Sequence, residues 1–121
     1  MKVYSFEKLD VWNKAADFVC ELYKVTRKFP SEEKYGLTSQ LRRAAVSIAS
    51  NIAEGSSRKS KKDQSRFYVI AYSSTIEVIN QLIIAKRLEY LQQEEYENLR
   101  KQMEEITGLI GGLHKSLNTK P

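Results

Sequence analysis

A cluster of positively charged side chains is the feature of this sequence best suited to chemistry. Five of them fall within nine residues, opposed there only by Asp63. Lysine and arginine bind phosphates, and such binding weakens as salt rises because it releases counterions. A helix is predicted to begin inside the cluster, where free backbone amides also favour anions. The predicted nucleic-acid-binding residues are this cluster and two earlier arginines: Arg58, Lys59, Lys61, Lys62 and Arg66, with Arg42 and Arg43.

The overall charge does not by itself require such a partner. The chain has 20 Lys plus Arg against 15 Asp plus Glu, for a formal net charge of +5. An excess of this size is also typical of a solvated helical surface. Two hypotheses from different classes therefore stay open. One is an oligomer that binds nucleic acid, RNA in particular, and the other is a protein-interaction scaffold with no nucleic-acid role.

No catalytic or metal-binding constellation is recognisable. Metal sites need several His, Cys or carboxylate ligands brought together, and this chain has one histidine, His114, and one cysteine, Cys20. Neither a phosphate-binding loop nor a dinucleotide-binding fingerprint occurs. We therefore expect no enzymatic activity, cofactor, metal or small-molecule substrate, and the apolar neighbours of Cys20 predict that it is buried.

Three polar residues inside otherwise apolar helices are predicted to have structural roles. Glu77 is expected to be a buried charge paired with Arg42 or Arg43, because burial of a charge is tolerated only when it is paired. An acid–base couple of Glu54 with Glu77 is disfavoured, since the two lie at opposite ends of the predicted hairpin. Asn51 is expected to bond to the backbone or to a nearby serine.

Hydrophobic periodicity predicts four helices that must position these residues. Their expected ranges are about 9–28, 37–54, 61–88 and 93–117, after a short extended arm at 1–7 and before a flexible tail at about 118–121. Gly55 is expected to end the second helix in the left-handed conformation. Ser60 with Asp63 is expected to cap the third. With short connections, one domain over 1–121 folding as an all-α, antiparallel up-down-up-down four-helix bundle is predicted.

The apolar stripes predict both a core and surplus apolar surface. The first helix carries two stripes, and the third is apolar almost all round, whereas a lone bundle buries one side of each helix. Self-association to a homo-oligomer is therefore expected. The predicted core consists of Leu41, Ile48, Ile52, Phe67, Ile70, Leu99, Met103 and Ile106.

The cellular compartment is predicted from what the sequence lacks. A single cysteine cannot form an intramolecular disulfide, which is typical of a reducing environment. The N-terminal residues lack the apolar run of a signal peptide, and charged residues are expected to interrupt any membrane-spanning helix. We therefore expect a soluble cytoplasmic protein with no membrane partner.

Several motifs resemble a known family. They are F-x-x-L-x-V-W at 6–12, F-P-x-E-E-x-Y-G-L at 29–37, Q-L-R-R-A-A at 40–45, S-x-x-S-N-I-A-E-G at 47–55 and R-F-x-x-I-A at 66–71. Together they resemble the four-helix-bundle proteins encoded by intervening sequences of bacterial 23S rRNA genes, often labelled ribosomal-protein-like. The most specific block is N-I-A-E-G at 51–55.

The resemblance implies an antiparallel four-helix bundle that assembles as a ring-like homopentamer without known enzymatic activity. The chain is also similar to the accessory protein of diversity-generating retroelements, a basic pentamer that engages nucleic acid. It departs from the family pattern at Ala49, where proline is common, and at Ser73, where glycine is common. Both departures favour regular helix, and neither affects the basic cluster.

Overall fold

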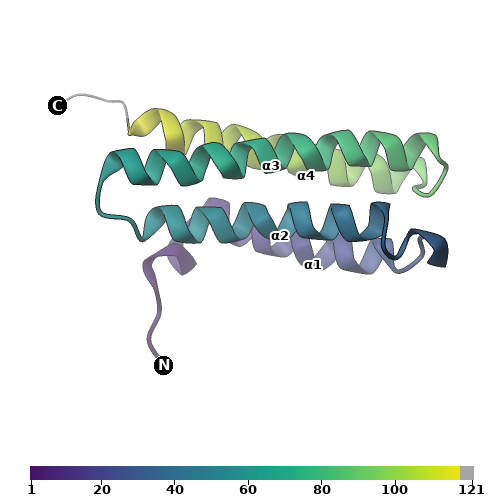
Figure 1. Ribbon diagram of the computed structural model, residues 1–121, viewed down its shortest axis with the longest axis horizontal. Helices are drawn as coiled ribbons and strands as arrows, with labels where there is room; N and C mark the ends of the chain where they lie inside the picture. Colours follow the sequence, from purple (N-terminus) through teal and green to yellow (C-terminus); the bar gives the residue numbers. More distant parts are fainter. Residues whose placement is uncertain (118–121) are drawn as a thin grey trace.

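The structure is a computed structural model that describes residues 1–117, and it consists of helices (Figure 1). No strand occurs in that part of the chain, so the predicted all-α class with four long helices is confirmed, with each long helix within two residues of its expected bounds. The predicted tail lies outside the described residues. The elements in chain order are η1 (Ser5–Lys8), α1 (Asp10–Thr26), η2 (Ser31–Glu33), α2 (Leu37–Ser56), α3 (Lys61–Arg87) and α4 (Gln93–Ser116).

Each long helix packs against two others. The backbone of α2 runs beside α1 and α3, and that of α4 runs beside α1 and α3, so α1 and α3, like α2 and α4, are diagonal to each other in the bundle. The α1/α2 side of the molecule is therefore opposite the α3/α4 side. The α2–α3 connection lies at one end, and the α1–α2 and α3–α4 connections lie at the other (Figure 1).

The core is formed by the inward faces of all four helices. Six of the eight predicted core residues are buried: Leu41, Ile48, Ile52, Leu99, Met103 and Ile106. Of the two stripes on α1, the one that contains Phe18 and Leu22 packs into this core, and the one that contains Trp12 and Val19 stays partly exposed. The surplus apolar surface expected of α1 is thus present on the molecule.

The predicted core was wrong on α3. Ile70 is 44% exposed, and Phe67 is only half-buried. The inward positions are instead taken by a row of mostly smaller residues that includes Ala71, Thr75 and Ala85. Small inward side chains let α3 approach its neighbours closely. On a helix that is apolar almost all round, the periodicity could not identify this inner face.

Gly55 does not end α2 in a left-handed conformation. It lies inside the helix, which runs on to Ser56, and no glycine among the described residues has a positive φ. A Cβ added at Gly55 would lie 2.6 Å from Cε1 of Tyr68 and 3.0 Å from Cβ of Phe67. Glycine is therefore required here because α3 comes so close, and the predicted capping role is wrong.

The cap of α3 was predicted correctly, whereas the N-terminal arm and Cys20 differ from the predictions. Ser60 caps α3 as expected, since its Oγ accepts a hydrogen bond from the backbone N–H of Asp63 at 3.1 Å. The N-terminal arm is not extended throughout, because a 3-10 turn begins at Ser5. That turn brings Phe6 against Trp12, with ring centroids 4.9 Å apart. Cys20 is exposed on the outer face of α1, so its predicted burial was wrong.

Helix α3 is long and apolar enough, by length and composition, to span a membrane, and it is the one described helix with this property. The expectation that charges interrupt every such segment is therefore wrong for α3. Core helices of soluble proteins reach the same length and apolarity, and 33% of the apolar window of α3 is buried inside the molecule. The cytoplasmic location stays a prediction.

Candidate nucleic-acid interface

The five clustered cations lie at one end of the molecule, where α2 connects to α3, and all five are exposed. We refer to Arg58, Lys59, Lys61, Lys62 and Arg66 as the basic tip. Its only ion pair within residues 1–117 joins Arg66 to Asp63, at 4.0 Å between exposed groups. Exposed pairs of this kind contribute little free energy, and the other four cations of the tip have no ion pair in the described chain.

Two arginines of the basic tip share one aromatic ring. The guanidinium carbon of Arg58 lies 4.6 Å from the ring centroid of Phe67, and that of Arg66 lies 5.6 Å from it. Stacking on a ring orients a guanidinium while leaving its N–H donors free for another acceptor. Phe67, predicted as a core residue, thus organises the tip, a role that an aromatic directly after Arg66 could have indicated.

The connection itself is held by local hydrogen bonds. Besides the Ser60 cap, the side-chain amide of Gln64 donates to the carbonyl oxygen of Arg58 at 2.8 Å. The chain between the helices is therefore fixed at both ends of the turn. The first turn of α3 presents its N-terminal amides beside the tip cations, and both favour an anion.

Arg42 and Arg43 lie on α2 far from the basic tip, about 22 Å away at 1.5 Å per helical residue. Arg42 is engaged: its Nε donates to Oγ1 of Thr26 at 2.9 Å, and a terminal nitrogen donates to the carbonyl oxygen of Tyr23 at 3.2 Å. It also stacks on the Tyr23 ring at 4.3 Å. The predicted Arg42–Glu77 pair is therefore wrong, because Arg42 faces α1.

The three polar residues predicted to have structural roles differ in the contacts that they make. Asn51 donates to the carbonyl oxygen and Oγ of Ser47, at 2.8 and 3.0 Å, as expected. Glu54 is exposed, with no ion pair in the described chain. Glu77 is exposed rather than buried, and neither Arg42 nor Arg43 forms an ion pair with it, because α3 turns this position toward the surface beside α2.

Two opposite sides of the molecule carry apolar surface. We call the α1/α2 side the first flank; its groove of about 420 Å³ is lined by Phe6, Trp12, Ala16, Val19, Cys20, Val46, Ala49, Ser50 and Ala53. The second flank is the α3/α4 side, where Val69, Tyr72 and Ile76 are 43–49% exposed. There a smaller pocket of about 250 Å³ is lined by Tyr68, Val69, Tyr72, Ser73, Gly111 and His114.

The second flank contains the sole histidine. His114 Nε2 and the Ser65 hydroxyl are 2.8 Å apart, which links α4 to α3. Beside it, burial raises the pKa of the Tyr68 phenol. No group of three or more His, Cys, Asp or Glu residues that could hold a metal occurs in residues 1–117. The contact that His114 makes is with the Ser65 hydroxyl, so its role in the structure is to join α4 to α3.

Comparison with known proteins found a matching family model and a similar solved structure. The model of the 23S rRNA-intervening sequence protein family matches residues 7–112. A solved structure of a protein with unknown function from the S23 ribosomal protein family of Bacteroides thetaiotaomicron superposes with a TM-score of 0.78 and 26% identity. The match covers 87% of this chain and 98% of that one. No curated protein matches. With most of its length matched by the family model, this chain belongs to the 23S rRNA-intervening sequence protein family.

Proposed function

We propose that this protein is a non-enzymatic homo-oligomer that binds nucleic acid, RNA in preference, through the phosphates. The observation that carries the proposal is the basic tip: five exposed cations at a helix N-terminus, with one weak ion pair among them in the described chain. Such a surface attracts phosphate without reading bases. Binding across unrelated sequences is therefore expected.

Self-association is proposed from the two apolar flanks. They lie on opposite sides of the molecule and differ in shape, since the first is a groove of about 420 Å³ and the second combines a smaller pocket of about 250 Å³ with the exposed side chains of Val69, Tyr72 and Ile76. A surface that docks onto a different surface of the next copy gives a head-to-tail contact, which closes into a ring when the rotation allows. We propose five antiparallel up-down-up-down subunits on the family resemblance, in the cytoplasm.

The ring strengthens the nucleic-acid proposal. Each subunit would contribute one basic tip, and sites linked on one particle act together through effective concentration even when each is weak. The flanks are lined by side chains along the helices, whereas the tip lies at the end where α2 connects to α3 (Figure 1), so docking of the flanks is compatible with an exposed tip. Oligomerisation and phosphate binding are thus compatible on one molecule.

Binding to RNA and to DNA of unrelated sequences, measured at a series of salt concentrations, tests the proposal. We compare wild type with a tip variant, Arg58→Gln, Lys59→Gln, Lys61→Gln and Lys62→Gln. The matched control removes four exposed cations elsewhere: Lys8→Gln, Lys24→Gln, Arg87→Gln and Lys101→Gln. The control should bind nearly as wild type, and the tip variant should bind more weakly with a flatter dependence of log affinity on log salt.

Two results would contradict the proposal. If wild type binds neither nucleic acid at about 50 mM salt, where electrostatic binding is strong, the scaffold function replaces it. The same holds if tip and control variants lose affinity equally, because total charge and not the tip would then be responsible. Light scattering after size exclusion tests the assembly separately, and a 14.0 kDa particle at micromolar concentration would contradict it.

A further inference from the structure

A pocket of about 290 Å³ lies where α1 connects to α2, at the end of the molecule opposite the basic tip (Figure 1). Among residues 1–117, three cations line it, Arg27, Lys34 and Arg42, and no acidic residue does. It shares no lining residue with the pockets of the two apolar flanks. This pocket is therefore a separate site with positive charge in its walls.

The three cations differ in how they are held. Arg42 is fixed against α1 by its bonds to Thr26 and Tyr23, so its charge has a set position at the pocket. Arg27 and Lys34 are exposed and form no ion pair in the described chain. Arg27 ends α1, whereas Lys34 belongs to the connection, so the two side chains come from different segments. Their N–H donors are available to a ligand.

The two acidic residues of the connection, Glu32 and Glu33, do not line the pocket. Both oxygens of Glu33 are engaged: Oε1 accepts the backbone N–H of Leu37 at 3.0 Å, and Oε2 accepts the Tyr90 hydroxyl at 2.9 Å. Glu32 is exposed and pairs with none of the described cations. An anion in the pocket would therefore meet donors in its walls and no carboxylate.

One nearly buried hydroxyl of the pocket is free. Thr38 is 8% exposed, and its hydroxyl has no hydrogen-bond partner within residues 1–117. The hydroxyl still reaches solvent, because the one side-chain atom of the described chain that is both unpaired and closed to solvent is Oε1 of Gln81. Polar groups this buried usually have a partner. The Thr38 hydroxyl can donate to a ligand that enters the pocket.

The start of α2 adds donors at the same place. The backbone N–H of Leu37 is bonded to Glu33, whereas those of Thr38 and Ser39 have no partner among the described residues. No acidic residue lies in the first turn of α2, and no side chain caps it at Gly36. Free first-turn amides and the positive end of the helix dipole favour an anion. The helix start thus reinforces the Thr38 hydroxyl and the cations.

We propose that this pocket binds the phosphate of a phosphomonoester. Arg27, Lys34 and the Thr38 hydroxyl donate to its oxygens, and the fixed charge of Arg42 stabilises its negative charge. Such a phosphate has three terminal oxygens and nearly two negative charges at neutral pH, which suit donors from three segments of the chain. A carboxylate has two oxygens and one charge. The site is independent of the basic tip and does not rest on the function proposed above.

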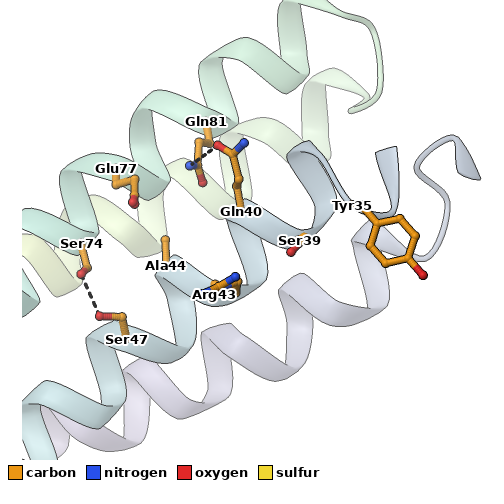
Figure 2. Close-up of a pocket in the computed structure, with 9 residues that line it drawn as sticks. All are labelled: Tyr35, Ser39, Gln40, Arg43, Ala44, Ser47, Ser74, Glu77 and Gln81. Atoms are coloured by element: carbon orange, nitrogen blue, oxygen red, sulfur yellow. Dashed lines mark hydrogen bonds between the residues drawn. The ribbon is translucent and has the colours of Figure 1, made fainter. Parts of the chain in front are cut away.

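The larger groove between α2 and α3, of about 400 Å³, lacks these properties (Figure 2). Ser47 bonds to Ser74, and two glutamine side chains bond to each other, as the dashed lines in Figure 2 show. The charged residues that line it, Arg43 and Glu77, have opposite signs. An anion is therefore accommodated better at the connection of α1 to α2.

Titration calorimetry and phosphorus NMR on the full chain at low salt test the proposal. The probes are ribose 5-phosphate and inorganic phosphate, compared with ribose, which lacks the phosphate, and dimethyl phosphate, a diester with one charge. We expect both phosphates to bind and ribose not to bind. Dimethyl phosphate should bind at least about tenfold more weakly than ribose 5-phosphate, as for loss of one charged hydrogen-bonding group.

Variants assign the binding to the pocket. Arg27→Gln and Lys34→Gln change exposed side chains and should each weaken ribose 5-phosphate binding about tenfold or more. Lys8→Gln and Lys101→Gln remove exposed cations elsewhere and should leave it unchanged. Thr38→Val removes the hydroxyl at nearly constant volume and should weaken binding about tenfold, whereas Thr38→Ser keeps the hydroxyl and should bind nearly as wild type. Circular dichroism checks that each variant folds.

The phosphate can belong to a small free ester or to the 5′ end of a nucleic acid, and one pair of oligonucleotides separates these sources. The tip variant is used, so that the basic tip does not dominate binding. It is titrated with an RNA that carries a 5′-monophosphate and with the same RNA ending in a 5′-hydroxyl. Tighter binding of the phosphorylated RNA, lost on adding Arg27→Gln, would assign the pocket to nucleic-acid ends. Equal binding of the two RNAs, with ribose 5-phosphate bound, would assign it to small esters.

Several results would overturn the proposal. One is the absence of binding of ribose 5-phosphate and inorganic phosphate up to about 10 mM, where a site even weaker than about 1 mM would still register. Others are equal binding of dimethyl phosphate, unchanged binding by Thr38→Val, or equal losses in the pocket and control variants, since overall charge would then be responsible. Loss of nucleic-acid binding in the tip variant, with ribose 5-phosphate binding intact, would support two separate sites.

Discussion

The two ends of this molecule use the same kind of side chain in different ways. At the end where α1 connects to α2 and α3 to α4, which we call the tied end, Arg42 donates to Thr26 and to the Tyr23 carbonyl. At the basic tip, Arg58 has a cation–π contact with Phe67 and no ion pair in the described chain. An arginine whose donors are engaged holds the fold, whereas one held only by an aromatic face stays available to a ligand.

The rest of the tied end follows the same rule. Glu33 accepts the backbone N–H of Leu37 at 3.0 Å and the Tyr90 hydroxyl at 2.9 Å, and Tyr90 packs on Phe29. Lys28 pairs with Glu95 across to α4. At this end, therefore, charged side chains are bonded to other parts of the fold. The comparison teaches that charge count alone does not locate a binding surface; the pairing of each charge does.

The largest expected effect comes from the core that joins both ends. Ile48→Ala should lower the free energy of unfolding by about 2–5 kcal/mol, because it removes buried methylene groups and leaves a cavity. Denaturant unfolding followed by circular dichroism measures this. If the loss were under about 0.5 kcal/mol, the typical size for a surface change, Ile48 would not be in the core. If hydrogen exchange showed that Ile48→Ala lowers the protection of backbone amides at one end only, the two ends would unfold separately.

At the tip end, Gly55→Ala should destabilise by about 1–3 kcal/mol. The added Cβ would overlap the buried Tyr68 ring, and overpacking outweighs the better helix propensity of alanine. Gly108→Ala is the matched control, since nothing lies within 4 Å of its added Cβ. That substitution should stabilise the helix by up to about 1 kcal/mol. Equal gains from both would show that α3 can move away from α2.

Substitution of one arginine at each end tests whether the contacts of that arginine stabilise the fold. Arg42→Gln should lower the free energy of unfolding by about 1–2 kcal/mol, because it removes charged hydrogen bonds to Thr26 and Tyr23. Arg58→Gln should change it by less than about 0.5 kcal/mol, as is usual for an exposed side chain. Thermal and denaturant unfolding measure both. If Arg58→Gln lowered the free energy of unfolding more than Arg42→Gln, the arginine at the tied end would not be the one that stabilises the fold.

The sequence predicted the elements well and their inward faces less well. Helix bounds followed from periodicity and caps such as Ser60, which depend on local chemistry. Ile70 and Gly55 were misjudged because both depend on how closely α3 approaches α2, a distance that no local pattern contains. For the candidate site, Arg58 to Arg66 could be identified from clustering. The engagement of Arg42 by Thr26 and Tyr23 could not, because it needs the packing of α1 on α2.

The smallest expected effect is a pH dependence at the tied end. Hydrogen bonds from the Leu37 backbone N–H and the Tyr90 hydroxyl lower the pKa of Glu33 below its ordinary value of 4.5. A carboxyl whose pKa is lower in the folded state stabilises the fold above its unfolded pKa, and this contribution is lost as pH falls through the folded value. Glu33→Gln should therefore lower Tm slightly at pH 7, and the difference from wild type should shrink from about pH 5 downward. Glu32→Gln, an exposed neighbour, is the control and should leave the Tm profile near that of wild type. A Tm difference for Glu33→Gln that stays constant from pH 7 to pH 3, about 1.5 pH units below the ordinary pKa, would show that the charge of Glu33 does not stabilise this end.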